Sequence, residues 1–207
     1  MTGLAAAFDA QNRLAELAER IRQSTVQLQA GPHQLGAGIA WGEDLVITNA
    51  HVAVADSLEV TRPDRQRRQG RLVARDPKRD VALLEVPRLD LAPVSLGGSA
   101  RLRPGMLVFA IGHPFGLVGA LATGIVHAVG PAPSQWIPNA VAGRLPWLML
   151  DMEVAPGNSG GPVLDAHGEV VGITTMIAFG LTLAVPGEAA FRWASHQLQQ
   201  RRSKRTA

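Results

Sequence analysis

The chain has 207 residues, of which 46% are apolar and 18% are charged, and its formal net charge is +3. This balance is typical of a folded protein with a substantial core and excludes an intrinsically disordered chain. Because the sequence contains no cysteine, disulfides, thiolate metal sites and a cysteine nucleophile are also excluded.

The first segment, residues 4–23, carries apolar residues at helical spacing, which predicts an N-terminal amphipathic helix. Such a helix covers the core by default, and an oligomer contact is the alternative. Its apolar residues 4–8 follow no basic segment and are broken by Asp9, so neither a signal peptide nor a membrane anchor is visible. The simplest expectation is a cytoplasmic protein, unless the chain is a trimmed piece of a longer one.

From residue 24 onward the sequence breaks into short β-prone runs separated by turn residues. Six runs precede residue 87 and six lie between 106 and 186, joined by a connection at 88–105. Strands spaced so closely predict antiparallel barrels or sandwiches, because parallel strands would need a helix in each crossover. Residues 187–202 then predict a closing amphipathic helix. The runs are STVQLQ, LGAGIAW, DLVIT, LEVTR, RLVAR and VALLEV, then MLVFAI, ALATGIVHAV, WLMLDM, PVLD, EVVGITT and GLTLAV.

Two other features of the sequence have alternative interpretations. Residues 130–146 contain four prolines, which is typical of an active-site surface loop or of a disordered insertion. Basic residues gather at 62–79 and 201–205. A nucleic acid or another acidic partner would suit them, but a solvated loop and a frayed tail are the favoured interpretation, so nucleic-acid binding is not expected.

The stretch APGNSGGP, residues 155–162, surrounds Ser159 with glycine and proline. A serine nucleophile needs a neutral imidazole to take its proton and an acid to orient that imidazole. His51 follows the apolar run LVIT, where it can be held firmly at a cleft, although a structural histidine would also fit there. Asp80 directly precedes the run VALLEV, either as a turn residue or as a partly buried acid.

The turn before Ser159 is suited to hold a negatively charged oxygen. The successive N–H groups of Gly157, Asn158 and Ser159 can converge on one point, and glycine permits the positive φ that such a turn needs. No group of His, Asp and Glu residues has the spacing of a metal site, so we expect no metal and no cofactor.

Three motifs in this order, TNAHV, RDVALLEV and PGNSGGP, resemble the Deg/HtrA family of chymotrypsin-like serine proteases. Flanking segments such as LGAGIAW, LRPGMLVFAIGHPFGL and TGIVHAVG match as well, so the resemblance covers residues 24–190. It implies an all-β fold of two six-stranded antiparallel β-barrels, the first at 24–87 and the second at 106–186. An N-terminal helix (1–23) and a C-terminal helix with a basic tail (187–207) would lie outside the barrels.

The same resemblance implies a role for each candidate catalytic residue. His51 would be the general base, Asp80 the acid that orients it, and Ser159 the nucleophile. The N–H groups of Gly157 and Ser159 would form the oxyanion hole, with Asn158 as a further donor.

Substrate binding is implied at five residues of the second half. Thr175, Met176 and Ile177 would pair with an extended substrate as an antiparallel strand. Glu153 occupies the base of the primary specificity pocket and, pointing inward, would favour Lys or Arg before the cut. An outward Glu153 would leave Val154 to shape the pocket, and the free-energy cost of an unpaired buried carboxylate favours this case.

The sequence departs from the family pattern at several places. Asn158 stands where many relatives outside the family have an acid that pairs with a new amino terminus, so activation by N-terminal cleavage is not expected. His113 stands where asparagine is common, and we interpret it as structural. Many family members carry a C-terminal PDZ domain, whereas this sequence resembles an isolated protease domain.

The leading hypothesis is a serine endopeptidase that cleaves unfolded or extended polypeptides in protein quality control. The alternative is a peptide-binding or chaperone-like module whose protease site is held inactive. Because family members commonly assemble as trimers through their N-terminal segments, the resemblance also implies a homo-oligomer.

Overall fold

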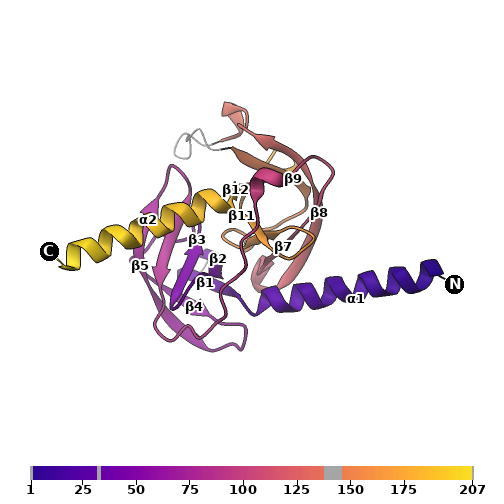
Figure 1. Ribbon diagram of the computed structural model, residues 1–207. Coiled ribbons are helices and arrows are strands. Elements are labelled where there is room, and N and C mark those ends of the chain that lie inside the picture. Colours follow the sequence, from indigo (N-terminus) through magenta and orange to yellow (C-terminus); the bar gives the residue numbers. More distant parts are fainter. Residues whose placement is uncertain (1, 32–33, 138–145, 207) are drawn as a thin grey trace.

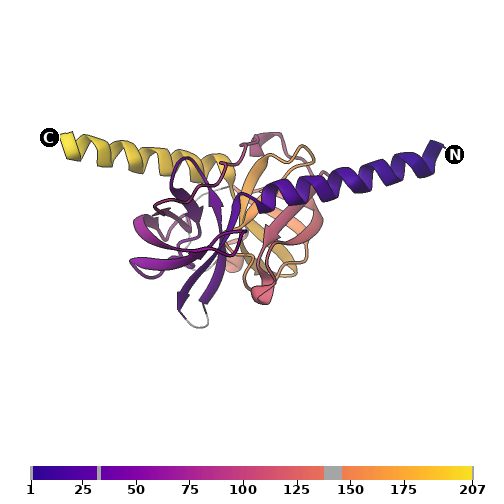
Figure 2. The ribbon, with the colours of Figure 1, turned by 90° about the horizontal axis from the view of Figure 1, so that it is seen from below.

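The computed structural model describes residues 2–31, 34–137 and 146–206 and contains two β-barrels with a helix at each end of the chain (Figure 1). The helices α1 (Thr2–Arg22) and α2 (Gly187–Thr206) extend from the barrels in opposite directions, as both views show (Figure 2). Within the described ranges, neither helix is apolar enough over its length to cross a bilayer.

The first barrel is closed and antiparallel, with its strands in the order β1-β2-β3-β6-β5-β4 and β4 paired back to β1. The pairing of β3 with β6 places Thr48 opposite Ala82. This register brings the end of β3 close to the start of β6, and candidate residues lie next to both of these strand ends. The strands are β1 (Thr25–Gly31), β2 (Gln34–Ala40), β3 (Leu45–Thr48), β4 (Ser57–Thr61), β5 (Arg67–Asp76) and β6 (Val81–Glu85).

The second barrel is closed in the same way, in the order β10-β11-β12-β9-β8-β7, with β7 paired back to β10. Its strands are β7 (Leu107–Gly112), β8 (Ala120–Gly130), β9 (Trp147–Met152), β10 (Pro162–Leu164), β11 (Val170–Ala178) and β12 (Leu181–Pro186). Two six-stranded antiparallel barrels between terminal helices confirm the fold class predicted from the sequence.

Each barrel has its own apolar interior, because alternate residues of its strands point inward. Leu28, Val60 and Leu84 are buried inside the first barrel, and Val108 and Leu150 inside the second. The barrels are therefore two packed cores and not open channels.

A third apolar cluster joins the two barrels and the helices. It combines Ile47 of the first barrel with Ile173 of the second. Ile21 in the last turn of α1 and Phe191 of α2 close this cluster, and the Phe191 ring centroid lies 5.8 Å from that of Trp41. Both helices thus cover the core at the ends where they meet the barrels.

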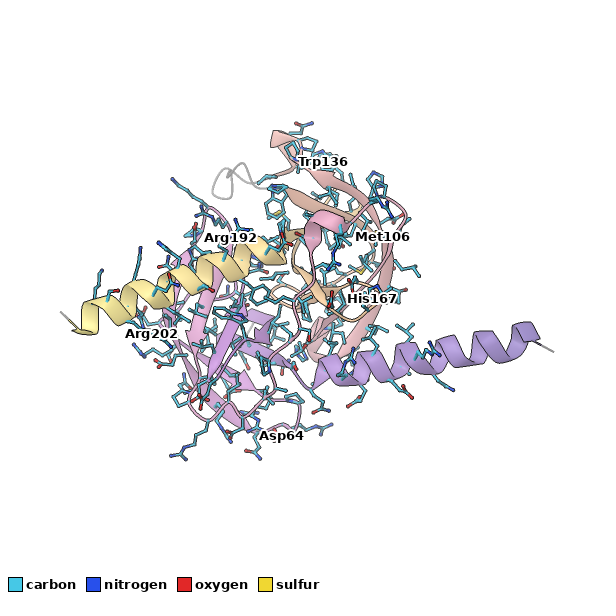
Figure 3. The ribbon with its side chains drawn as sticks, viewed as in Figure 1. Asp64, Met106, Trp136, His167, Arg192 and Arg202 are labelled. Atoms are coloured by element: carbon cyan, nitrogen blue, oxygen red, sulfur yellow. The ribbon has the colours of Figure 1, made fainter. Side chains whose placement is uncertain are left out.

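The ends of two predicted segments differ from expectation. Helix α2 runs to Thr206, beyond the predicted end at residue 202, because Lys204 and Arg205 are of residue types that favour a helix. Figure 3 shows Arg202 near the outer end of α2, past the barrels. The proline-rich segment at 130–146 follows β8 and contains a 3-10 turn, η3 (Ser134–Trp136), while residues 138–145 lie outside the described residues.

Candidate active site

His51 and Asp80 meet because β3 and β6 are neighbours in the first barrel. His51 lies three residues after Thr48, where β3 ends, and Asp80 lies directly before β6. The antiparallel register places these two strand ends side by side. The Nδ1 atom of His51 is 2.7 Å from Oδ2 of Asp80, and the backbone N–H of His51 donates to Oδ1 of Asp80 at 2.9 Å.

The buried carboxylate of Asp80 determines how the His51 ring is oriented. Asp80 is 2% exposed, while the side chain of His51 is 47% exposed. A carboxylate can only accept, so Nδ1 of His51 carries the proton and the lone pair of the neutral ring lies on Nε2. The exposed edge of the imidazole can therefore take a proton from a neighbouring group.

Asn49 links the two barrels next to Asp80, a contact that the sequence did not predict. Its side-chain Nδ2 donates to the backbone carbonyl of Asp80 at 2.9 Å and to Oγ1 of Thr175 at 3.2 Å. Asn49 is fully buried at the end of β3. Its position after an apolar strand was a weak signal, because a polar residue there also fits an ordinary turn.

Ser159 lies on a turn of the second barrel that is also bonded to the first. We call residues 155–159, which contain the candidate oxyanion-hole donors, the oxyanion turn. The N–H of Ala37 on β2 donates to the carbonyl of Ser159 at 2.7 Å, and the N–H of Gly160 donates to the carbonyl of Thr174 at 2.8 Å. The backbone of the serine is thus held from both sides.

The hydroxyl of Ser159 donates to the carbonyl oxygen of Thr175 at 3.0 Å. Among the residues that the structure describes, no hydrogen bond joins this hydroxyl to His51. The three candidate catalytic residues are nevertheless brought to one region, because Asn49 contacts both Asp80 and Thr175.

Two N–H groups of the oxyanion turn are available to a ligand. The N–H of Asn158 donates to the carbonyl of Ala155 at 3.0 Å, so the third donor named from the sequence is already used. No hydrogen bond within the described ranges occupies the N–H groups of Gly157 and Ser159.

The orientation of Gly157 follows from its backbone contacts. The N–H of Phe115 donates to the carbonyl of Pro156 at 3.0 Å. Because the C=O and N–H of a trans peptide point in opposite directions, the N–H of Gly157 points away from Phe115. Gly157 has φ of +105°, and an added Cβ would lie 2.2 Å from the carbonyl oxygen of His113, so only glycine fits here.

A pocket of about 290 Å³ adjoins Ser159. Val154, Met176 and Ile177 contribute to its walls. Glu153 does not line this pocket; it is exposed and lines a separate, smaller one. The structure therefore has Glu153 in the outward arrangement, with Val154 beside the serine.

Strand β11 has an unpaired edge beside the same pocket. Its pairing with β10 ends at Ile173, while its pairing with β12 continues through Met176 and Ile177. The register with β12 shifts between Thr174 and Met176, which makes Thr175 a bulged residue. Bulges often re-aim backbone groups next to active sites, and here one edge of the strand is left open to another chain.

Comparison with known proteins agrees with this geometry. Residues 36–173 match the trypsin-like peptidase domain family. A Pseudomonas putida protein named a probable periplasmic serine endoprotease DegP-like is 40% identical over 180 residues, which are 83% of this chain and 36% of that relative. This chain belongs to the trypsin-like peptidases of the Deg/HtrA family.

Other members of the Deg/HtrA family are similar at the level of sequence and fold. The putative serine protease HhoB of Synechocystis is 38% identical over 167 residues, 77% of this chain and 39% of that protein. The HtrA-type protease AlgW, solved with a tripeptide, has a TM-score of 0.76 at 28% identity over 86% of this chain and 61% of its own. Deg5 has a TM-score of 0.75 at 29% identity, covering 88% of this chain and 92% of its own.

The relatives also correct one expectation. Those from Pseudomonas are named periplasmic endoproteases, so the cytoplasmic location expected from the N-terminal residues is wrong. That expectation rested only on the absence of a visible leader among the N-terminal residues, and such an absence does not determine a protein's location. The chain spans 36% of the length of the first of these relatives.

His113, where asparagine is common in the Deg/HtrA family, is a buried neutral imidazole that is 2% exposed. Its Nδ1 accepts the N–H of Gly119 at 3.2 Å, so the ring proton lies on Nε2. Burial lowers the pKa of His113 to about 4, and an interaction with the backbone of Val26 offsets part of the effect. Among the residues that the structure describes, none forms a hydrogen bond with Nε2.

We predict that His113 makes the protein less stable in acid. Between pH 6.5 and 4 the unfolded chain binds a proton that the folded protein excludes, so the free energy of unfolding falls as the pH is lowered through this window. The loss should reach about 3 kcal/mol at pH 4. Urea unfolding of wild type and His113→Asn at pH 7, 6, 5 and 4 measures it, and the variant should have a flatter dependence.

The matched control is His196→Asn, because His196 lies on the exposed surface of α2. This variant should keep the pH dependence of the wild type. Equal slopes for wild type and His113→Asn between pH 6.5 and 4 would contradict the assignment of a buried neutral His113.

Proposed function

We propose that this chain is a serine endopeptidase that cleaves unfolded or extended polypeptides through an acyl-enzyme. One observation carries the proposal. The exposed Nε2 of His51 is backed by the buried Asp80, and it lies in the region of a serine whose turn offers two unoccupied N–H groups. Membership of the Deg/HtrA family supports the same chemistry.

The substrate would bind as a strand along the open edge of β11. Its backbone N–H and C=O groups would pair with those of Thr175 and Ile177, for which the described strands provide no partner on that side. Only an extended segment can form such pairs, and this restricts cleavage to unfolded or flexible polypeptide. The side chain before the scissile bond would enter the pocket beside Val154.

In the proposed reaction Nε2 of His51 takes the hydroxyl proton while Oγ of Ser159 attacks the scissile carbonyl carbon. The resulting oxyanion accepts hydrogen bonds from the N–H groups of Gly157 and Ser159. Each donor of this kind stabilises the transition state by roughly 2.7 to 4 kcal/mol. The C–N bond then breaks and His51 protonates the leaving amine. Water, deprotonated by His51, hydrolyses the ester and restores Ser159.

A second candidate function is a peptide-binding or chaperone-like module with a resting protease site. The observation that favours it is the hydroxyl of Ser159, which donates to the carbonyl of Thr175 and not to His51. In the endopeptidase this bond would have to be exchanged when substrate binds. The two candidates therefore differ in whether peptide binding frees the hydroxyl.

A role in protein quality control and assembly into a homo-oligomer, with a trimer as the family form, complete the proposal. Helix α1 suits such assembly because it extends well beyond the barrels (Figure 2). Its inner end contacts the core through Ala18 and Ile21.

We predict that wild-type protein cleaves casein and that Ser159→Ala lowers the rate constant by about 10⁶-fold, as loss of a serine nucleophile does elsewhere. Gel electrophoresis of timed digests measures the cleavage. Ser95→Ala is the matched control, because Ser95 is an exposed serine in the connection between the barrels, and it should cleave like the wild type.

The outcome separates the two candidate functions. Wild type that binds casein and protects it from aggregation without cutting it, as Ser159→Ala also does, would favour the resting module. Cleavage that persists unchanged in Ser159→Ala would sink the assignment of the nucleophile.

The outward Glu153 leads to a prediction about specificity. In a panel of peptides that differ only in the residue before the cut, small and medium aliphatic side chains should be cut fastest, and kcat/KM should change by about 10- to 200-fold per methylene misfit. Glu153→Gln should keep this preference, whereas Val154→Glu should abolish it. Fastest cleavage after Lys or Arg, lost in Glu153→Gln, would show instead that Glu153 reaches the substrate.

A further inference from the structure

The loop between β7 and β8, residues 113–119, holds the oxyanion turn in place. The N–H of His113 donates to the carbonyl of Gly157 at 3.0 Å, and the N–H of Phe115 donates to the carbonyl of Pro156 at the same distance. These two carbonyls flank the Gly157 residue whose N–H is a candidate oxyanion donor. Within the described ranges no other hydrogen bond reaches either carbonyl, so the loop alone determines how the two peptide planes are turned.

The middle of the 113–119 loop, residues 115–118, has little packing, whereas His113 and Gly119 at its two ends are buried. Phe115 is 76% exposed, Leu117 is 66% exposed and Val118 is 52% exposed. Phe115 also has φ of +51°, a conformation that a bulky residue rarely adopts. The backbone hydrogen bonds within the loop form a single 3-10 turn, η2 (Pro114–Gly116). Apolar burial therefore does not hold residues 115–118. The ends of the loop are joined by the pairing of Gly112 with Ala120, and a further anchor lies next to this pair.

Gly119 provides that anchor at the end of the loop. Its N–H donates to Nδ1 of His113, and its carbonyl accepts Nε of Arg22 at 2.5 Å. A Cβ on Gly119 would lie 2.7 Å from Cδ of Arg22, so the arginine stem packs directly against this glycine. Nη1 of Arg22 is held in turn by Glu19 at 3.0 Å. One residue, Gly119, thus joins helix α1 to the loop through its two neighbouring peptide groups.

Helix α1 is itself fixed to the second barrel one turn earlier. Leu17 packs against Gly168, where an added Cβ would lie 2.1 Å from Cδ1 of Leu17. Figure 3 places His167, the residue before Gly168, close to the inner end of α1. Arg20 adds only an exposed contact of 3.5 Å to the His167 carbonyl, so Leu17 and not Arg20 fixes the helix here. The helix is therefore a firm support from which Arg22 reaches the loop.

We propose that Arg22 is a positioning residue for the oxyanion hole, acting through Gly119 and His113 on the carbonyls of Pro156 and Gly157. Arg22 touches no reacting atom, and its effect is on the orientation of the Gly157 N–H. The inference rests on the serine endopeptidase function proposed above. It makes the inner end of α1 part of the machinery that forms the site.

The test compares Arg22→Gln with Arg22→Lys and with the matched control Arg20→Gln, which removes a bond from the same helix to a different loop. With a fluorogenic peptide, Arg22→Gln should lower kcat by about 10- to 100-fold, less than the loss of a direct donor, with KM unchanged. Arg22→Lys, which can still donate to the Gly119 carbonyl, should recover most of kcat. Arg20→Gln should match the wild type.

Two further measurements exclude a general loss of structure. Affinity for a peptidyl boronic acid, which forms a tetrahedral adduct at the serine, should fall in Arg22→Gln by at least about 10-fold, because this adduct requires the oxyanion hole. Binding of an unreactive peptide in the Ser159→Ala background should stay the same. Wild-type kcat in Arg22→Gln, or an equal loss in Arg20→Gln, would overturn the inference.

Amide hydrogen exchange separates this inference from the proposed function. Arg22→Gln should speed exchange at the amides of His113 and Phe115 by about 10-fold or more, whereas Arg20→Gln should not. This readout needs no activity. If the wild type cuts nothing, the proposed function fails, but the exchange rates still test whether Arg22 holds the 113–119 loop. Unchanged protection of the His113 and Phe115 amides in Arg22→Gln would overturn the role of Arg22 and leave the proposed function standing.

Discussion

The alignment of β3 with β6 is the constraint on which the candidate site depends. His51 and Asp80 are 29 residues apart in the chain and come from two different turns. They meet because Thr48 pairs with Ala82, so that the turn after β3 and the turn before β6 lie at the same end of the two paired strands. A shift of this register by one residue would turn the strand faces over and move the carboxylate away from the imidazole. The apolar residues of β6, buried on both faces, oppose such a shift.

Few polar contacts cross between the barrels at the site, and each is made by a buried backbone or amide group. The N–H of Ala37 holds the carbonyl of Ser159, and Asn49 joins Asp80 to Thr175. An unsatisfied group in such a place would cost about 1 to 3 kcal/mol, so these bonds strongly favour one relative placement of the barrels. Apolar burial in the cluster with Ile47 and Ile173 stabilises the contact between the barrels, and the polar contacts determine how the barrels are aligned.

The fold and the residue types of the site could be predicted from local patterns, whereas their contacts could not. Alternating apolar runs and turn residues were enough for the twelve strands, and the motifs around His51, Asp80 and Ser159 were enough to name candidates. The bulge at Thr175, the occupied N–H of Asn158 and the bond from Arg22 to Gly119 depend on backbone groups far apart in the sequence. Every residue carries such groups, so no pattern of side chains distinguishes them.

The contact between Ser159 and Thr175 gives the proposed reaction an order. In the described structure the carbonyl of Thr175 accepts the serine hydroxyl. The same carbonyl lies on the open stretch of β11, where an extended substrate would present an N–H. A carbonyl oxygen has two lone pairs, so a substrate N–H could bind beside the hydroxyl, but the two donors would then be crowded at one atom. In the proposed reaction this crowding would favour the turn of the hydroxyl from Thr175 toward His51, and would link strand formation to activation of the nucleophile.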